Sequence, residues 1–264
     1  MKMNINIDIR FVFSLLIVSV LAGCSPDNNG NMDGEGERKS SDPESPNIVY
    51  ILADDLGYGD IGAYGQEKIE TPHIDALAEN GMTFTRHYSG APVCAPARYM
   101  LMTGRHPGKA YVRGNDPMAE RGDVWDFKAM YENPELEGNV PIPDSTVTIA
   151  EVLKEAGYRT GLVGKWGLGA PFTEGLPNRQ GFDYFYGYVC QRQAHTYYPS
   201  HLWKNEERVH LDNELIDPHQ GLPEGADPSD PASYARFHDQ PDYAAELMGG
   251  EALRFIGDQS GGGD

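Results

Sequence analysis

A cysteine, a proline and an arginine stand close together at the start of the short apolar segment 94–102. Arg98 follows Cys94 by about one helical turn, and a proline such as Pro96 is tolerated in a first turn. A helix N-terminus carries partial positive charge and free N–H groups, which favour an anion. The segment therefore indicates an anion-binding site around a nucleophile. A reactive thiolate is one interpretation of the cysteine, and a buried inert thiol is the other.

Two adjacent aspartates and a lysine supply the remaining charged groups. Asp54 and Asp55 follow the apolar run 47–53, and Lys165 ends the segment 158–165. In open α/β sheets, ligand-binding and catalytic residues lie at the carboxyl ends of the strands. Neighbouring carboxylates repel each other unless a cation joins them, and their oxygens suit a hard ion such as Ca²⁺ or Mg²⁺. The alternative is a solvated turn in which Asp54 caps the residues that follow.

The elements that must position these groups alternate between strand and helix. Continuous apolar runs with β-branched residues are typical of buried strands, and N-caps with capping boxes mark helix starts. The expected strands are 47–53, 82–89 and 158–165. The expected helices are 72–80, 94–102 and 149–157. Thr71 is the expected N-cap of the first helix and Thr148 that of the third. This alternation predicts an α/β fold with a mainly parallel sheet flanked by helices.

Composition narrows the function classes. The chain has 264 residues, enough for one large domain with a real core, and a formal net charge of −19 at pH 7. Such an acidic chain repels nucleic acid and anionic lipid head groups, so we expect no nucleic-acid partner. Three cysteines cannot build a disulfide framework.

The first segment has the features of an export signal, and we do not expect it to be part of the folded domain. Residues 1–23 have a basic start and a short apolar run that ends in Leu-Ala-Gly before Cys24, which resembles a bacterial lipobox. We expect Cys24 to be acylated, residues 24–45 to form a flexible acidic tether, and the folded part to occupy 46–264. Ser25 after the cysteine favours a lipoprotein anchored in the outer membrane, on its periplasmic or surface side. An ordinary cleaved signal peptide is the alternative.

Four segments together resemble a known family. Residues 94–105 read C-x-P-x-R-x-x-x-x-T-G-R, which is similar to the signature of type I, formylglycine-dependent sulfatases of the alkaline-phosphatase superfamily. Residues 46–65 resemble the sulfatase N-terminus, 157–169 its lysine motif, and 178–188 the segment that follows. The resemblance runs in the right order over about residues 46–200, and it implies an arylsulfatase-like sulfuric ester hydrolase.

The resemblance also implies roles for individual residues. A separate maturing enzyme would oxidise Cys94 to Cα-formylglycine, whose hydrate attacks the sulfate sulfur; its second hydroxyl later expels the sulfate. Asp54 and Asp55 would bind Ca²⁺, or Mg²⁺, together with an oxygen of the modified Cys94. Arg98 would hold the formylglycine hydrate and Lys165 a sulfate oxygen. The substrate would be a sulfated glycan or an aryl sulfate.

One departure from the family pattern lies at Gly167. The family often has a histidine after the tryptophan of its lysine motif, and Gly167 stands there in this chain. Another histidine is expected to compensate or to line a substrate subsite, and His195 is the residue we assign to substrate binding. A plain surface histidine is the alternative for His195 and for His106. The aromatic residues near His195 are further candidates for stacking on sugar rings, or for core positions. They are Tyr197, Tyr198, His201 and Trp203.

The end of the sequence differs from the family as well. Family members continue beyond this length and supply a further histidine, a lysine and an Asp-Asn pair for the metal. Asp212 and Asn213 lie too early to be that pair, and the helix expected from about 242 runs into a glycine-rich end. We therefore expect the chain to correspond to the N-terminal part of a sulfatase, apparently truncated at its C-terminus.

Three functions are compatible with these residues. The first is the lipid-anchored sulfatase. The second is an inactive truncated remnant, or a lipoprotein that only binds sulfate or sugar. The third is a phosphatase or phosphodiesterase of the same superfamily, which Cys94 argues against because those enzymes usually have a serine or threonine nucleophile. Metal content separates the first from the second, and aryl sulfate against aryl phosphate turnover separates the first from the third.

Overall fold

The computed structural model describes residues 45–118 and 126–259. The expected signal segment 1–23, the acylation site Cys24 and all but the last residue of the expected tether lie outside these ranges. Residues up to Leu52 and residues from Ala53 onward form separate units. In the described part of the chain, no helix has the length and apolar character needed to cross a membrane.

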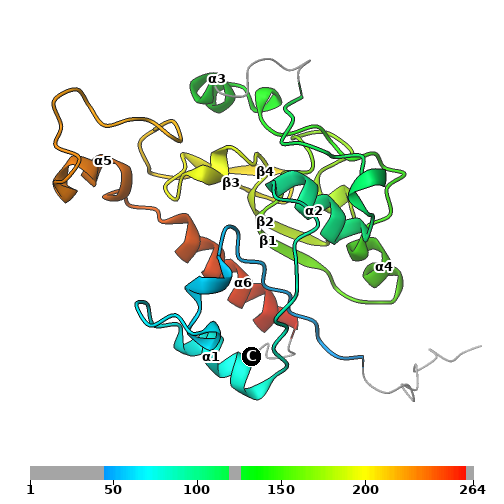
Figure 1. The fold of residues 1–264 in the computed structure, drawn as a ribbon. Helices are drawn as coiled ribbons and strands as arrows, with labels where there is room; N and C mark the ends of the chain where they lie inside the picture. The colour runs from blue at the N-terminus through cyan, green and yellow to red at the C-terminus, as the bar shows by residue number, and fades with distance from the viewer. Residues whose placement is uncertain (1–44, 119–125, 260–264) are drawn as a thin grey trace, which may run out of the picture. The chain divides into compact units, whose positions relative to one another are not determined.

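Short helices and one sheet make up the regular structure (Figure 1). The α-helices are α1 (Pro72–Asn80), α2 (Cys94–Thr103), α3 (Phe127–Glu132), α4 (Ile149–Glu155), α5 (Ala235–His238) and α6 (Ala244–Gln259). The strands are β1 (Gly161–Lys165), β2 (Tyr184–Tyr188), β3 (His201–Lys204) and β4 (Glu207–His210). Single 3₁₀ turns lie at Tyr58–Asp60, Gly62–Tyr64, Pro107–Lys109, Pro134–Leu136, Pro177–Arg179, Gln193–His195 and Pro231–Tyr234.

The four strands form one sheet in the order β1-β2-β3-β4. β1 pairs with β2 in parallel, whereas β2 with β3 and β3 with β4 are antiparallel. The expectation of a mainly parallel sheet is therefore wrong for the described residues, although the α/β class is confirmed. The connections give the reason. The 166–183 segment is long enough for a crossover, but only Asn205 and Glu206 join β3 to β4, and so short a link forces a hairpin.

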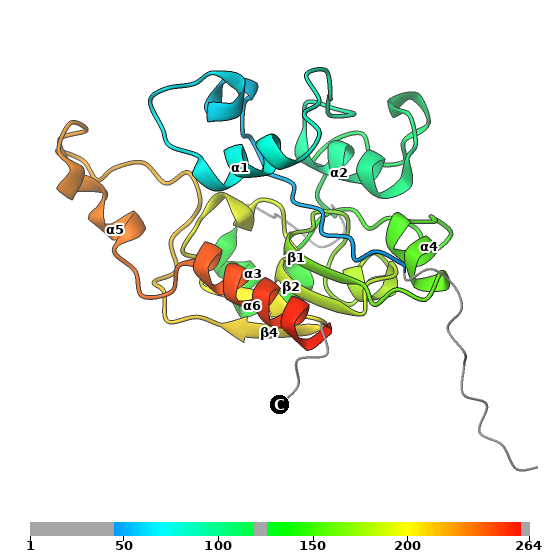
Figure 2. The ribbon, with the colours of Figure 1, turned by 90° about the horizontal axis from the view of Figure 1, so that it is seen from below.

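Helices cover both faces of this sheet, as expected. Alternate residues of a strand point to opposite faces. Tyr184 and its neighbours at every second position of β2 pack with Leu202 and with Ala244 of α6. Phe185 packs on the other side in a cluster with Tyr99 of α2 and Ala150 of α4. Figure 2 shows α6 lying along β1 and β2.

The expected helix starts are confirmed, and local sequence explains them. Thr148 accepts a hydrogen bond from the backbone N–H of Glu151, whose carboxylate in turn accepts from the Thr148 N–H, which completes the capping box of α4. α1 begins directly after Thr71 with proline at its first position. α2 ends at Gly104, which takes a left-handed conformation with φ 63°.

The strands expected at 47–53 and 82–89 are not present. Residues 47–53 form no ladder, and Ile51, in the middle of the run, is 80% exposed. Met82, Phe84 and Tyr88 in the second segment are exposed as well. A strand is stabilised by its hydrogen-bonded neighbours, and no described segment pairs with either run. An apolar run was therefore not sufficient to predict a strand.

Two glycines allow β1 and β2 to approach closely. Gly164 and Gly187 are register partners, and both have a positive φ. A Cβ added at Gly187 would lie 2.0 Å from the carbonyl oxygen of Gly164, whereas a Cβ at Gly164 would meet nothing within 4 Å.

We expect Gly187→Ala to destabilise the protein more than Gly164→Ala does. Both variants suffer backbone strain of about 1–3 kcal/mol, and only Gly187→Ala adds an overlap costing about a further 1–3 kcal/mol. Urea unfolding monitored by tryptophan fluorescence measures the difference. Equal losses in the two variants would show that the strands do not approach as closely as described.

Candidate active site

Asp54, Arg98 and Lys165 converge on one point. The Asp54 Oδ2 atom lies 2.8 Å from Lys165 Nζ and 3.0 Å from Arg98 Nη2. Arg98 also donates a hydrogen bond from Nη1 to the backbone carbonyl of Lys165. The two cationic side chains are mostly buried, at 15% and 11% exposed, whereas the carboxylate is 35% exposed. The structure therefore joins three of the residues that the sequence proposed, although 111 positions separate Asp54 from Lys165.

The two cations keep the Asp54 carboxylate ionised. Partial burial acts to raise the pKa of Asp54, but hydrogen bonds and charge from Lys165 and Arg98 outweigh this effect and lower the pKa. A negative charge held between two positive groups costs little to maintain. The same two positive groups could hold a sulfate oxygen, because both offer charged N–H donors to an anion.

Cys94 is the first residue of α2, and its free thiol is half-buried. The backbone N–H of Ala95, in the first turn of the helix, donates a hydrogen bond to the Asn115 side chain at 3.0 Å. Arg98 lies one turn further along the same helix, as expected, and reaches Asp54 from there. The helix thus presents a cysteine at its positive end and a guanidinium on the following turn.

Asp55 adopts a strained backbone conformation beside Asp54. Its φ is 63°, which is uncommon for a residue with a side chain, although aspartate tolerates it better than most. Such outliers concentrate at functional sites. The turn separates the two side chains, so that Asp54 meets the cations while Asp55 is exposed.

The described residues do not by themselves build a metal site. Among them, no three His, Cys, Asp or Glu side chains are grouped to hold an ion. Ca²⁺ takes 6–8 oxygen ligands. Asp54 and Asp55 have the right donor chemistry, but Lys165 and Arg98 already engage Asp54. The predicted trio of Asp54, Asp55 and Cys94 is thus not arranged as a closed coordination group.

His195 forms part of a histidine pair. Its Nδ1 atom lies 2.6 Å from Nε2 of His219. Partial burial lowers the pKa of His195, as do the positive charges of Lys165 and of His219 when protonated, against the opposing effect of the Asp54 and Asp55 charges. The charges of the Asp54–Lys165 centre therefore act on His195, although no direct contact joins them among the described residues.

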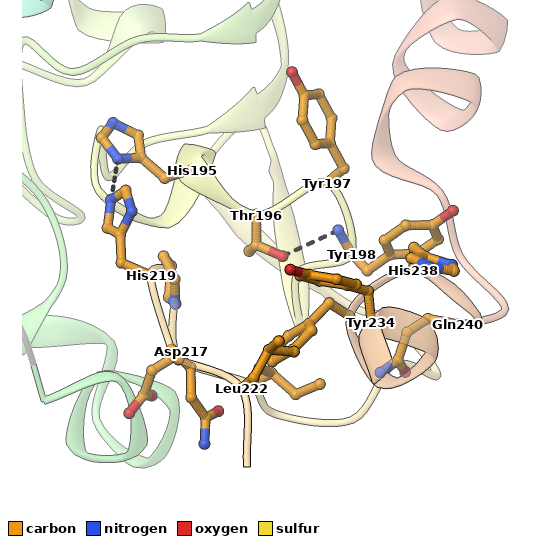
Figure 3. Close-up of a pocket in the computed structure, with 15 residues that line it drawn as sticks. His195, Thr196, Tyr197, Tyr198, Asp217, His219, Leu222, Tyr234, His238 and Gln240 are labelled. Atoms are coloured by element: carbon orange, nitrogen blue, oxygen red, sulfur yellow. Dashed lines mark hydrogen bonds between the residues drawn. The ribbon is translucent and has the colours of Figure 1, made fainter. Parts of the chain in front are cut away.

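A pocket of about 470 Å³ opens beside the histidine pair (Figure 3). Its walls come from the segments 195–198, 216–222 and 234–240. Tyr197 and Tyr198, two candidates for stacking on a sugar, line it. The other two candidates, His201 and Trp203, are 3% and 1% exposed, so they are core residues.

Local packing explains why position 167 carries glycine. Gly167 has φ 75°, and a Cβ there would lie 2.9 Å from Oε1 of the buried Gln191. A histidine at this position would therefore require a different backbone and a displaced glutamine. His106 does not compensate for it by any contact described, because its Nδ1 atom accepts a hydrogen bond from Gly108 and caps a surface turn.

His219 is the site residue that sequence reasoning missed. It lies in an irregular segment with φ 66°, 24 positions after its partner His195. The sequence carries no periodic or motif signal for such a contact. Only the fold brings the two imidazoles together.

The fold and site define an α/β protein in which two cationic side chains meet one carboxylate, with a cysteine at the start of the helix that carries the arginine. The family model described as Sulfatase matches residues 46–241. The chain therefore belongs to the sulfatase family, as its motifs predicted. Formylglycine and Ca²⁺ are general features of that family.

Relatives and one solved structure agree with this assignment. The chain is 40% identical over 156 residues to arylsulfatase D of Homo sapiens, covering 57% of this chain and 24% of that protein. It is 39% identical over 176 residues to the N-acetylgalactosamine-6-O-sulfatase of Bacteroides thetaiotaomicron, covering 63% and 30%. The crystal structure of Ps i-CgsB in complex with k-i-k-neocarrahexaose is similar with a TM-score of 0.55 at 26% identity, covering 80% of this chain and 41% of that one. The chain thus spans less than a third of the length of these two curated relatives.

Proposed function

We propose that this chain contributes the nucleophile and the sulfate-binding cations of a sulfuric ester hydrolase that acts on a sulfated glycan or an aryl sulfate. The observation that carries the proposal is the meeting of Arg98 and Lys165 at Asp54, with Cys94 one helical turn before Arg98. The names of relatives support the substrate class, because one is an N-acetylgalactosamine-6-O-sulfatase and another an arylsulfatase.

The chain's own residues have distinct roles in this proposal. A formylglycine formed from Cys94 supplies, as its hydrate, an oxygen nucleophile with a second hydroxyl for release of sulfate. Arg98 orients that group from the next turn of α2 and shares its charge with Asp54. Lys165, at the end of β1, holds a sulfate oxygen and offsets charge that develops on it. His195 faces the remainder of the substrate from the pocket.

The maturation step balances as a two-electron oxidation. The side chain CH₂SH and one water give the aldehyde CHO, hydrogen sulfide, two protons and two electrons. The maturing enzyme must therefore deliver the electrons to an oxidant. The half-buried thiol has to become accessible to that enzyme, and modification before folding satisfies this requirement.

The two aspartates would be the ligands that the described residues offer to Ca²⁺. Asp54 and Asp55 would contribute carboxylate oxygens, with Mg²⁺ as the alternative ion. Because Lys165 and Arg98 engage Asp54, the ion would have to share that carboxylate with them.

We expect co-expression with a sulfatase-maturing enzyme to convert Cys94. The peptide that contains residue 94 should then lose about 18 Da, since one oxygen replaces one sulfur and two hydrogens. Mass spectrometry of the peptide, with 4-methylumbelliferyl sulfate and phosphate as paired substrates, measures conversion and reaction class together. Cys94→Ala is the control and should show neither the mass change nor turnover.

Each outcome of this experiment distinguishes the functions. Conversion with sulfate turnover supports the sulfatase. Preference for the phosphate ester would favour a phosphatase. An unconverted Cys94, beside a control sulfatase that is converted in the same cells, would contradict the proposal and favour an inactive relative that only binds its ligand.

We further propose that the protein is a lipoprotein of the outer membrane, on its periplasmic or surface side, anchored through Cys24. The lipobox-like Leu-Ala-Gly-Cys sequence after an apolar run supports this. Labelling with radioactive palmitate in a bacterial host should depend on Cys24. Equal labelling of Cys24→Ala would overturn the anchor.

A further inference from the structure

The pocket beside the His195–His219 pair has the composition of a sugar site. Its volume of about 470 Å³ falls in the usual range of small-molecule sites, roughly 300–1,000 Å³. Figure 3 shows His195 and His219 at one side of the pocket, and Tyr198, Tyr234 and His238 at the other. Aromatic faces interleaved with polar side chains suit a ring that has apolar C–H faces and hydroxyl edges.

The two tyrosines are held in place by contacts with the surrounding protein. The Tyr234 hydroxyl donates to the carbonyl of Pro228 at 3.1 Å. The Tyr198 ring packs against the Tyr243 ring with centroids 5.3 Å apart, and its backbone N–H donates to Thr196. Rings fixed in this way can stack on a ligand with little further loss of conformational entropy. Tyr198 and Tyr234 are therefore suited to be the stacking surface.

The charges around the pocket disfavour an anionic ring. Asp217 is the single carboxylate among the residues that line it, and neither lysine nor arginine belongs to that described lining. His238 lies 2.9 Å from the Asp239 carboxylate, which offsets any positive charge on its imidazole. Partial burial lowers the pKa of His195, so its charged form is disfavoured. A uronate or a second sulfate would therefore meet Asp217 without a compensating cation.

Exposed polar side chains on the pocket wall suit a polar ligand better than a purely apolar one. Asp217 and Gln220 both line the pocket and are exposed, so a ligand bound there would replace water at their side chains. A carboxylate is an acceptor for neutral hydroxyl donors, and an amide can both donate and accept. A sterol or a bare aryl group would displace this water without offering hydrogen bonds in its place.

We propose that this pocket binds a neutral sugar ring, the unsulfated and non-uronic neighbour of the ring that carries the scissile sulfate. The inference rests on the proposed function for its orientation toward the Asp54–Lys165 centre. Tyr198 and Tyr234 stack on the ring, and Asp217 accepts hydrogen bonds from its hydroxyls while excluding anionic rings. The pocket thus selects glycans in which sulfated and neutral residues are adjacent.

Ligand binding to the full chain tests this without requiring turnover. Saturation-transfer NMR and titration calorimetry would use neutral disaccharides (lactose, N-acetyllactosamine and cellobiose), an unsulfated chondroitin tetrasaccharide as the uronate probe, and a steroid alcohol as the apolar probe. At least one neutral disaccharide should bind, and the other two probes should not. Tyr198→Ala and Tyr234→Ala should each weaken binding by about tenfold. Tyr88→Ala, at an 80% exposed tyrosine outside the pocket, is the matched control and should bind normally.

Asp217→Lys tests the charge argument separately. This exposed substitution should let the chondroitin tetrasaccharide bind and should weaken the neutral disaccharides. Binding of the uronate or steroid probe to the unmodified protein would overturn the assignment of a neutral sugar. Absence of binding by every neutral disaccharide would overturn it as well.

Failure of this inference and failure of the proposed function are distinguishable. Turnover of 4-methylumbelliferyl sulfate without any neutral-sugar binding would leave the sulfatase proposal intact and reject the sugar pocket. Neutral-sugar binding that depends on Tyr198 and Tyr234, in a protein without sulfatase turnover, would support the pocket and contradict the enzymatic proposal.

Discussion

Replacing Glu137 by alanine is expected to lower the free energy of unfolding by about 3–5 kcal/mol. The Glu137 side chain is 1% exposed, and three side chains contact its carboxylate oxygens. Trp203 Nε1 donates to Oε1 at 2.9 Å, and Arg208 Nη2 donates to Oε2 at 2.7 Å. His201 Nε2 lies 3.0 Å from the same Oε2. Alanine would leave a buried guanidinium, an indole N–H and an imidazole without their acceptor, and unpaired buried groups are costly.

Several elements depend on this carboxylate. Trp203 and His201 belong to β3 and Arg208 to β4, while Arg208 also donates to the carbonyls of Met130 and Tyr131 in α3. The network therefore ties the β3–β4 hairpin to α3. Loss of Glu137 would loosen both attachments at once.

A solvent-exposed ion pair provides the matched control. Glu132 pairs with Lys128 on the surface of α3, with the two side chains 61% and 72% exposed. Exposed pairs of this kind contribute little, so Glu132→Ala should change the free energy of unfolding by less than about 1 kcal/mol. Urea unfolding of both variants at pH 7 gives the comparison. Similar losses in the two variants would refute the buried network.

Acid should remove part of the same stabilisation. Burial acts to raise the pKa of Glu137, but contacts with His201 and Arg208 outweigh it and hold the pKa below the ordinary value of 4.5. A folded-state pKa below the unfolded one gives stability that is present above about pH 4.5 and is lost as the pH falls through the folded pKa. The unfolding free energy of Glu137→Gln should consequently depend less on pH between 5 and 3 than that of the unmodified protein. Parallel pH profiles would contradict the assignment.

Local signals in the sequence predicted the helices but not the strand pairing. The Thr148–Glu151 capping box and the proline after Thr71 act over three or four residues, so they can be recognised without the fold. The run 47–53 needed a partner strand that the described residues do not provide. The β3–β4 hairpin did have a local signal in Asn205, which adopts φ 55° in the turn.

The candidate site was predicted in part for a reason that the structure does not support. Lys165 ends a strand, as expected, and Cys94 with Arg98 begins a helix. The sequence predicts Asp54 at the end of a neighbouring strand, yet the described residues 45–53 before it form no strand. Its contacts with the two cations depend on opposite charge instead. The pocket walls from 216–240 had no sequence signal, because irregular segments carry no periodic pattern.

In the matured protein, Lys165→Ala is expected to lower kcat/KM for an aryl sulfate by about 10²–10³-fold. Lys165 is 11% exposed at the end of β1, and its ammonium lies 2.8 Å from Asp54. Removal would leave Arg98 as the one cation that the described structure brings to Asp54, so the charge on a sulfate oxygen would lose much of its stabilisation. Arg98→Lys should also impair turnover, because one ammonium cannot reproduce the two directions in which Arg98 donates, to Asp54 and to the Lys165 carbonyl.

Lys154→Ala is the control that separates this catalytic effect from the loss of any lysine–aspartate pair. Lys154 Nζ lies 2.7 Å from Asp183, an ion pair of similar length between α4 and the turn before β2. We expect Lys154→Ala to retain kcat/KM, with at most a small loss of stability because its lysine is 49% exposed. Steady-state kinetics, together with the inhibition constant of inorganic sulfate, give the readout: Lys165→Ala should weaken sulfate inhibition, and Lys154→Ala should not. If both variants kept the activity and sulfate inhibition of the parent, Lys165 would have no role in binding the anion, and its contact with Asp54 would be purely structural.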